Sequence, residues 1–275
     1  MDCRAQTERG GLVVQDRGLA AYIAELIGTL FLVFVIGMVI SLFVSTGAAA
    51  TVGSDFVVVA FAQGLALFLL IIAFGQVSGG HFNPAVTVAA AAMRRIDPID
   101  AVVYILAQLS GGVLGALIVK GLLLDEGRAT SYGAATISDL LGGPFAAAVC
   151  EGIGAFFIVL AVCAVAMNPR ARQEWAPWAI GIALTFGVMI FGPLTGAALN
   201  PARWFGPALI GDAFGSFSDI WPYVIGPLVG ALVAVGVYRF VIAGPQYAEG
   251  AEPPTSAARG VSQAVTDAEV RARNK

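Results

Sequence analysis

Six long apolar stretches separated by short polar segments dominate this 275-residue chain. They lie at about 20–44, 55–75, 99–120, 145–167, 176–193 and 221–243. Each is close to the roughly 20 residues that a helix needs to cross a bilayer, and none alternates as a membrane strand would. The fifth stretch is short, and we expect Gly192 and Pro193 to interrupt its end. The pattern predicts an all-α membrane protein with six transmembrane helices.

The composition strengthens the membrane assignment and excludes several classes of protein. Apolar residues make up 58% of the chain and charged residues only 12%, whereas soluble domains carry about 25% charged residues. The mean hydropathy is +0.85. The 15 basic and 18 acidic residues give a net charge of −3, so the chain offers no basic field for a nucleic acid. We expect a lipid bilayer around the protein and no nucleic acid as a partner.

Side chains that carry enzyme chemistry are scarce. His81 is the only histidine, and Cys3, Cys150 and Cys163 are spaced for neither a disulfide framework nor a zinc site. No pair of a nucleophile and a base stands out along the chain. The sequence therefore predicts a protein that is not an enzyme and that uses no metal and no cofactor.

The basic residues outside the apolar stretches predict the orientation in the membrane, because cytoplasmic loops carry most Lys and Arg. If both termini are cytoplasmic, that side holds Arg4, Arg9, Arg17, Arg94, Arg95, Arg170, Arg172, Arg239, Arg259, Arg271, Arg273 and Lys275. Only Lys120, Arg128 and Arg203 then fall toward the other side. We expect a multi-pass protein of the cell membrane with cytoplasmic tails at 1–18 and 244–275, the second of them flexible.

The membrane domain, 19–243, consists of two related halves. The triplet that begins at Asn83 returns at Asn200, an offset of 200 − 83 = 117. We place the two repeats at about 19–125 and 126–243. Each repeat has three spans, and an odd number makes the second copy enter the membrane from the opposite side, which gives an inverted repeat.

Each repeat also holds a short apolar segment that cannot cross the membrane by itself. These segments, about 84–93 and 201–210, follow the triplets Asn83-Pro84-Ala85 and Asn200-Pro201-Ala202. Asn is a strong N-cap and Pro is favoured in the first helical turn, so each triplet predicts the start of a re-entrant half-helix. Inverted symmetry then brings the two positively polarised N-termini together at the membrane midplane.

The two triplets with their flanking residues resemble the signature segments of the aquaporin, or major intrinsic protein, family. The first is His81-Phe-Asn-Pro-Ala-Val-Thr87, the second runs from Thr195-Gly to Asn200-Pro-Ala-Arg203, and the resemblance covers about 20–243. It implies an aquaporin-like bundle of six tilted helices and two half-helices, with one pore per subunit and usually a homotetramer. It also implies a passive channel for water and small uncharged solutes, with both triplets in the pore.

Four residues occupy the positions of the family's selectivity constriction. The resemblance assigns Arg203 as the cationic member, and the family's spacing adds Gln63, Val188 and Ala197. Water-specific members usually have an aromatic residue where this chain has Gln63 and a histidine where it has Val188. We expect a wider constriction with one apolar wall, which favours the passage of glycerol or similar solutes beside water.

The carboxylates Glu25 and Glu151 are equivalent in the two repeats (151 − 25 = 126) and lie within apolar stretches. An ionisable residue inside a membrane favours a functional interpretation, such as a proton relay. The alternative that we favour is that each carboxylate accepts hydrogen bonds from a re-entrant loop, with Gln108 in a similar role. His81, two residues before the first triplet, is a candidate pore-lining or loop-anchoring residue.

These observations predict a passive channel for water and small neutral solutes that excludes protons and ions. A glycerol or metalloid-acid facilitator with low water flow is the alternative within the same fold. A secondary transporter, which also uses inverted repeats and half-helices, is the alternative from another class. It would need coupling carboxylates near its substrate, and only Glu25 and Glu151 are available in the spans.

Overall fold

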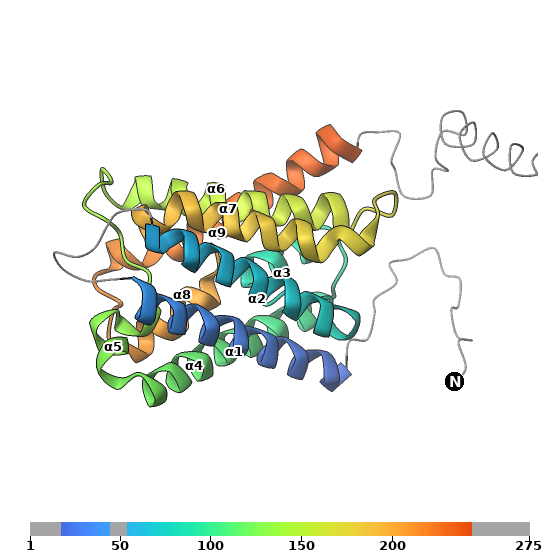
Figure 1. The fold of residues 1–275 in the computed structure, drawn as a ribbon. Coiled ribbons are helices and arrows are strands. Elements are labelled where there is room, and N and C mark those ends of the chain that lie inside the picture. The colour runs from blue at the N-terminus through green and yellow to red at the C-terminus, as the bar shows by residue number, and fades with distance from the viewer. Residues whose placement is uncertain (1–17, 45–53, 244–275) are drawn as a thin grey trace, which may run out of the picture. The chain divides into compact units, whose positions relative to one another are not determined.

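The computed structural model describes residues 18–44 and 54–243, and within them the chain folds into helices without a strand (Figure 1). The long helices are α1 (Gly18–Phe43), α2 (Ser54–Ser78), α4 (Pro98–Leu122), α6 (Pro144–Ala161), α7 (Ala176–Thr195) and α9 (Phe217–Val237). Two short helices, α3 (Pro84–Ala92) and α8 (Pro201–Ile210), follow the Asn-Pro-Ala triplets. Six helical spans are long and apolar enough to cross a membrane, which confirms the predicted fold class.

Shorter helical segments join or extend these helices. They are α5 (Leu124–Ala129), η1 (Ser131–Gly133), η2 (Val162–Ala166), η3 (Gln173–Trp175) and η4 (Tyr238–Ala243). The π-helical η2 and η4 extend α6 and α9, so these two spans reach the lengths expected from the sequence. One compact unit ends at Tyr238, and of the second unit only Arg239–Ala243 is described. The predicted tails, up to residue 17 and from residue 244, lie outside the described residues.

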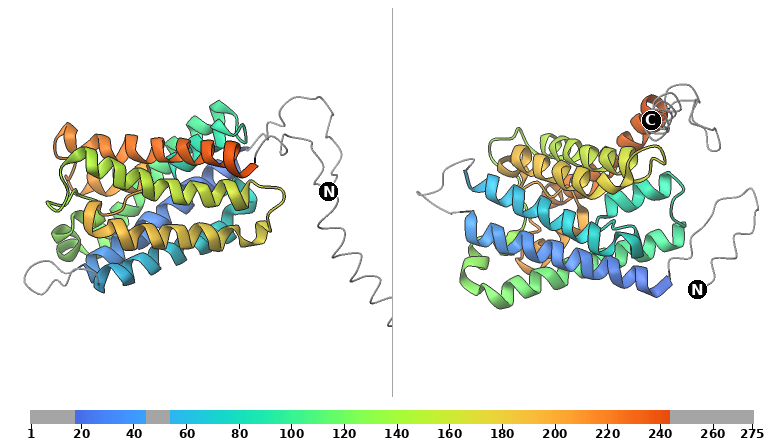
Figure 2. Two further views of the ribbon diagram at one scale, coloured as in Figure 1. Left: turned by 90° about the horizontal axis from the view of Figure 1, so that it is seen from above. Right: turned by 45° about the vertical axis from the view of Figure 1, so that its right-hand side comes forward.

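The long helices pack in pairs that correspond between the two halves. Helix α1 packs on α4, α6 packs on α9, and α2 packs on α7 (Figure 2). Glycines allow the backbones to approach closely in these pairs. A Cβ atom would lie 2.3 Å from the Leu26 carbonyl oxygen at Gly111 and 2.6 Å from the Ala148 carbonyl oxygen at Gly226. Small residues at helix contacts are typical of membrane bundles, where close packing replaces the hydrophobic effect.

The half-helices α3 and α8 lie between the long helices (Figure 1). The Asn83 side-chain amide donates to the Leu199 carbonyl at 3.0 Å, and the Asn200 amide donates to the Phe82 carbonyl at 2.8 Å. These reciprocal bonds connect residues at the beginning of one half-helix to the loop before the other. The two N-termini therefore meet inside the bundle, as the inverted repeat predicted.

The end of the fifth span differs from the prediction. Helix α7 runs through Gly192 and Pro193 to Thr195, so the expectation that these two residues interrupt it is wrong. A Cβ at Gly192 would lie 2.5 Å from the Phe56 ring, so this glycine makes room for α2. Proline is tolerated in membrane helices because neighbouring groups satisfy the freed carbonyl. The helix continues to Thr195 and is capped by Gly196, whose N–H donates to the Gly192 carbonyl and whose left-handed φ of 74° turns the following chain out of the helix.

Candidate functional site

The two half-helices begin with the same local structure. The Asn83 side-chain oxygen accepts a hydrogen bond from the Ala85 N–H at 2.9 Å, and the Asn200 oxygen accepts one from the Ala202 N–H at 3.0 Å. Both asparagines have extended backbones, and proline occupies the first helical position after each. Each side-chain oxygen is therefore used as an N-cap, which leaves the amide N–H groups to point elsewhere.

Those amide groups lie where the two loops meet. One N–H of each amide reaches the opposite loop, to the carbonyl of Leu199 or of Phe82. Phe82 and Leu199 have left-handed φ values of 47° and 52°, which are uncommon for residues with a side chain. The second N–H of each amide has no partner among the described residues, and both Asn83 and Asn200 line the same cavity. Two free N–H donors are thus available at the junction of the half-helices.

The loop before α3 is held by the buried carboxylate of Glu25. Its oxygens accept from the Ser78 hydroxyl at 2.6 Å and from the backbone N–H groups of His81 and Phe82 at 2.9 and 2.6 Å. The Gln108 amide also donates to this carboxylate, at 2.8 Å. Backbone groups that would otherwise be unpaired inside the bundle are therefore satisfied by one side chain of α1.

The loop before α8 repeats this arrangement around Glu151. The carboxylate accepts from the Thr195 hydroxyl at 2.6 Å and from the N–H groups of Ala198 and Leu199 at 2.9 and 2.5 Å. The Tyr223 hydroxyl donates to the Thr195 carbonyl at 2.9 Å. In the first half, the Tyr104 hydroxyl donates to the Ser78 carbonyl at 2.8 Å. Both carboxylates are fully buried, and neither lines the cavity.

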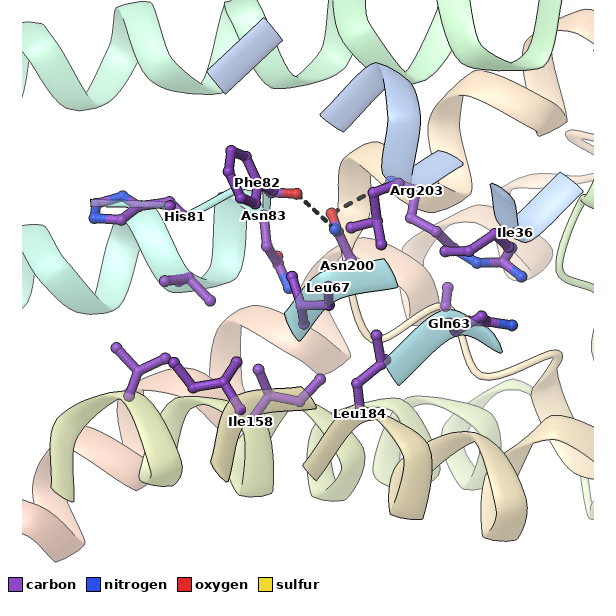
Figure 3. A pocket seen from close by; sticks show the side chains of 16 residues that line it. Ile36, Gln63, Leu67, His81, Phe82, Asn83, Ile158, Leu184, Asn200 and Arg203 are labelled. Carbon is purple, nitrogen blue, oxygen red and sulfur yellow. Dashed lines mark hydrogen bonds between the residues drawn. The ribbon is translucent and has the colours of Figure 1, made fainter. Parts of the chain in front are cut away.

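A narrow cavity passes the meeting point of the half-helices (Figure 3). It offers about 30 Å³ to the centre of a water-sized molecule, and a water needs roughly 10–15 Å³ by this measure. His81 lies at one end of it, Gln63 and Arg203 lie at the other, and the two asparagines lie between them (Figure 3). The predicted pore residues on this path are therefore brought together by the fold.

Arg203 and Gln63 are buried, with polar atoms left free. Arg203 is 1% exposed, and its guanidinium donates to the carbonyls of Gly133 at 2.9 Å and Gly196 at 3.4 Å. Its Nε atom has no partner among the described residues, and neither has the side-chain oxygen or nitrogen of Gln63. Buried polar atoms without partners are rare, and in a cavity wall they indicate a place where a polar molecule binds.

The other predicted residues lie close to this path, but not all of them face it. Val188 and Ala197 are buried at 1% and 0% exposure and are not among the residues that line the cavity, whereas Leu184, one turn before Val188, is. His81 lines the cavity, and its Nδ1 atom lies 3.1 Å from the Thr87 hydroxyl. Thr87 in turn accepts from the Gln108 amide at 2.9 Å, so Gln108 joins the cavity wall to the Glu25 carboxylate.

No motif in the sequence pointed to the apolar lining of the cavity. It includes Leu32, Ile36, Leu67, Ile158, Val162, Ile180 and Leu184. The internal repeat is the signal that could have found these residues, because 158 − 32 = 126, 162 − 36 = 126 and 184 − 67 = 117. The same offset of 117 relates Gln63 to Ile180 and Arg203 to Val86. A symmetric backbone thus carries its polar groups asymmetrically, with Gln63 and Arg203 at one end.

Comparisons with known proteins agree with this arrangement. A family model described as major intrinsic protein matches residues 14–238. Nodulin-26 of Glycine max is 38% identical over 241 residues, which are 85% of this chain and 82% of that protein. Glycerol uptake facilitator protein-like 6 of Lactiplantibacillus plantarum is 35% identical over 213 residues, covering 78% of this chain and 94% of that protein.

The fold also matches a solved structure. The X-ray structure of the aquaglyceroporin from Plasmodium falciparum superposes with a TM-score of 0.70 at 24% sequence identity, and the match covers 82% of this chain and 96% of that one. At this identity the likeness concerns the fold alone.

Proposed function

The chain belongs to the major intrinsic protein family, a family of membrane channels, and on this premise we propose that it conducts water and small uncharged solutes passively. The observation that carries the proposal is the pair of free amide N–H groups of Asn83 and Asn200 on the cavity wall. They lie at the N-termini of two half-helices, each of which carries about half a positive charge.

The paired donors explain how water passes without protons. A water molecule that accepts hydrogen bonds from both amides uses both of its lone pairs. Its own hydrogens then point along the passage and away from the centre, so the chain of hydrogen bonds needed for proton transfer is broken there. The positive ends of α3 and α8 oppose a cation at the same point. The role of the other triplet residues is to start these two helices; they are Pro84, Ala85, Pro201 and Ala202.

The loops that carry the asparagines need a rigid support. In our proposal Glu25, Glu151 and Gln108 supply it as loop anchors, and no proton passes through them. The three or four hydrogen bonds that each carboxylate accepts support this role. They also count against a secondary transporter, because no Asp or Glu of the described part lines the cavity.

In our proposal the constriction consists of Gln63, Arg203, Val188 and Ala197, and of these Gln63 and Arg203 line the cavity. Gln63 and the Nε of Arg203 offer unpartnered polar atoms, and Ile36 and Leu184 add apolar surface to the same cavity wall. A small polyol has hydroxyls on one edge and carbons on the other, so it matches this combination of polar and apolar groups. We therefore propose glycerol or similar solutes beside water, and a glycerol or metalloid-acid facilitator remains the second candidate. His81 lines the opposite end.

For the oligomeric state of the protein and its place in the membrane, we propose the pattern that is usual in the family. The protein would form a homotetramer in the cell membrane, with one pore per subunit and both termini in the cytoplasm. The six apolar spans and the basic residues between them support this topology.

Osmotic swelling of proteoliposomes tests the proposed function. We expect water permeability well above that of protein-free liposomes, glycerol uptake down its gradient, and no effect of collapsing a proton gradient. The variant Ile36→Trp should block both fluxes, because Ile36 lines the cavity beside Arg203 (Figure 3). Leu42→Trp on the exposed face of the same helix is the matched control. Uptake that requires a proton gradient, or unchanged flux in Ile36→Trp, would refute the proposal.

A further inference from the structure

We infer that the three-residue segment η1 (Ser131–Gly133) is a positioning device for the constriction, which holds the Arg203 guanidinium in one place. The inference rests on the proposed function, in which Arg203 is the cationic member of the constriction. It starts from the hydrogen bond of 2.9 Å that Arg203 donates to the Gly133 carbonyl, a residue 70 positions away in the sequence. The second bond, to the Gly196 carbonyl, is longer at 3.4 Å.

The backbone that delivers this carbonyl is strained. Ser131, Tyr132 and Gly133 have φ values of 48°, 55° and 88°, all in the left-handed region. Residues with a side chain rarely adopt this conformation, and two of them in succession persist only where the surrounding structure imposes them. A strained backbone beside a functional site is a recognised sign that the conformation itself is used.

Glycines on three separate elements impose this conformation. A Cβ at Gly211, which caps the end of α8, would lie 2.6 Å from the Ser131 carbonyl oxygen. A Cβ at Gly127 of α5 would lie 2.5 Å from the Tyr132 ring, and one at Gly37 of α1 would lie 2.9 Å from the Tyr132 carbonyl oxygen. Three elements therefore close on η1 at positions where only glycine leaves enough room.

Gly133 and Tyr132 complete the enclosure. A Cβ at Gly133 would lie 2.8 Å from the Cα of Gly37, so this residue sits directly against α1. The Tyr132 side chain is 4% exposed, and the Lys120 ammonium lies 5.5 Å from the centre of its ring. These elements therefore enclose the segment, while its last carbonyl points to the guanidinium.

The consequence concerns solute choice more than water flow. A guanidinium tethered to a fixed carbonyl resists displacement by a solute wider than water, and so slows the passage of that solute. An untethered guanidinium can be displaced by such a solute, whereas a single water passes in either state. Loosening η1 should therefore raise glycerol permeability relative to water permeability.

The variant Gly211→Ala tests this inference in the full chain reconstituted in liposomes. Its φ of −91° suits alanine, so the added methyl group acts by pushing Ser131. We expect the ratio of glycerol to water permeability to rise about fivefold, the factor that one hydrogen bond is typically worth. Gly121→Ala on α4, where a Cβ would meet nothing within 4 Å, is the matched control and should leave the ratio unchanged.

The same substitution in an Arg203→Val background separates positioning from general damage. If η1 acts through Arg203, adding Gly211→Ala to Arg203→Val leaves the ratio of glycerol to water permeability unchanged. An equal rise in both backgrounds, or no rise in the wild-type background, would overturn the inference. If Gly211→Ala cannot be recovered from membranes, Gly127→Ala makes the same test through the Tyr132 ring. A wild-type protein without water flow would overturn the proposed function and this inference together.

Discussion

Replacing Glu151 with leucine should destabilise the protein by an amount that can be worked out from its contacts. The Thr195 hydroxyl can turn to the Phe191 carbonyl at 3.3 Å when the carboxylate is removed. The N–H groups of Ala198 and Leu199 have no other partner among the described residues. Each buried N–H left unpaired costs about 1–3 kcal/mol, so the two together cost about 4 kcal/mol. For a protein of this size, that lowers the midpoint of thermal unfolding by about 10 °C.

Glu151→Gln is the matched variant, because it keeps one acceptor oxygen. Thr195 and Ala198 both bond to Oε1 of Glu151, so the amide oxygen can serve them, and only the Leu199 N–H then faces a donor. We expect about half of the loss, roughly 2 kcal/mol. Thermal unfolding of the purified protein in detergent measures both shifts, and osmotic swelling measures the water flow that remains.

Two results would refute this reasoning. If Glu151→Leu unfolds at the wild-type temperature, the carboxylate does not hold the loop. If Glu151→Gln keeps its stability but loses transport, the charge itself is used, which favours a proton-coupled mechanism over a passive channel.

The remaining predictions concern the constriction. Mercurials should leave water flow nearly unchanged, because neither described cysteine lines the cavity; strong block of the unmodified protein would show that another thiol reaches the pore. Ala197→Cys should create inhibition, because residue 197 lies between Ala198, which lines the cavity, and Gly196, whose carbonyl accepts from Arg203. Arg203→Val should keep water flow and admit protons or small cations, which a proton-flux assay measures. If an expression check shows that this variant fails to fold, the arginine is purely structural. Gln63→Phe combined with Val188→His should reduce glycerol flux more than water flux, by about 25-fold if two hydrogen bonds to the solute are lost; equal reduction of both fluxes in stopped-flow light scattering would contradict the assignment of Gln63.

The sequence determined the parts of this fold that obey local rules. A bilayer demands helices of a certain length with every backbone group paired, so apolar stretches of that length predict the spans directly. Asn followed by Pro is a local start signal, and both half-helices begin where it predicts, at Pro84 and Pro201. The repeat of the triplets implied that these starts face each other. The end of α7 could not be predicted in this way, because Gly192 serves the packing of Phe56, which is distant in the sequence.

Only the tertiary structure decided what surrounds the charged and polar groups of the cavity. Arg203 is visible in the sequence as a cation in an apolar region, but the partner in its shorter hydrogen bond is the backbone carbonyl of Gly133. Backbone carbonyls are present at every residue, so no side-chain pattern marks the one that is used. Its direction depends on three left-handed residues, and these depend on glycines of α1, α5 and α8 that approach from different parts of the chain. Local rules describe a residue and its neighbours, whereas this arrangement exists only when separate elements pack against the same segment.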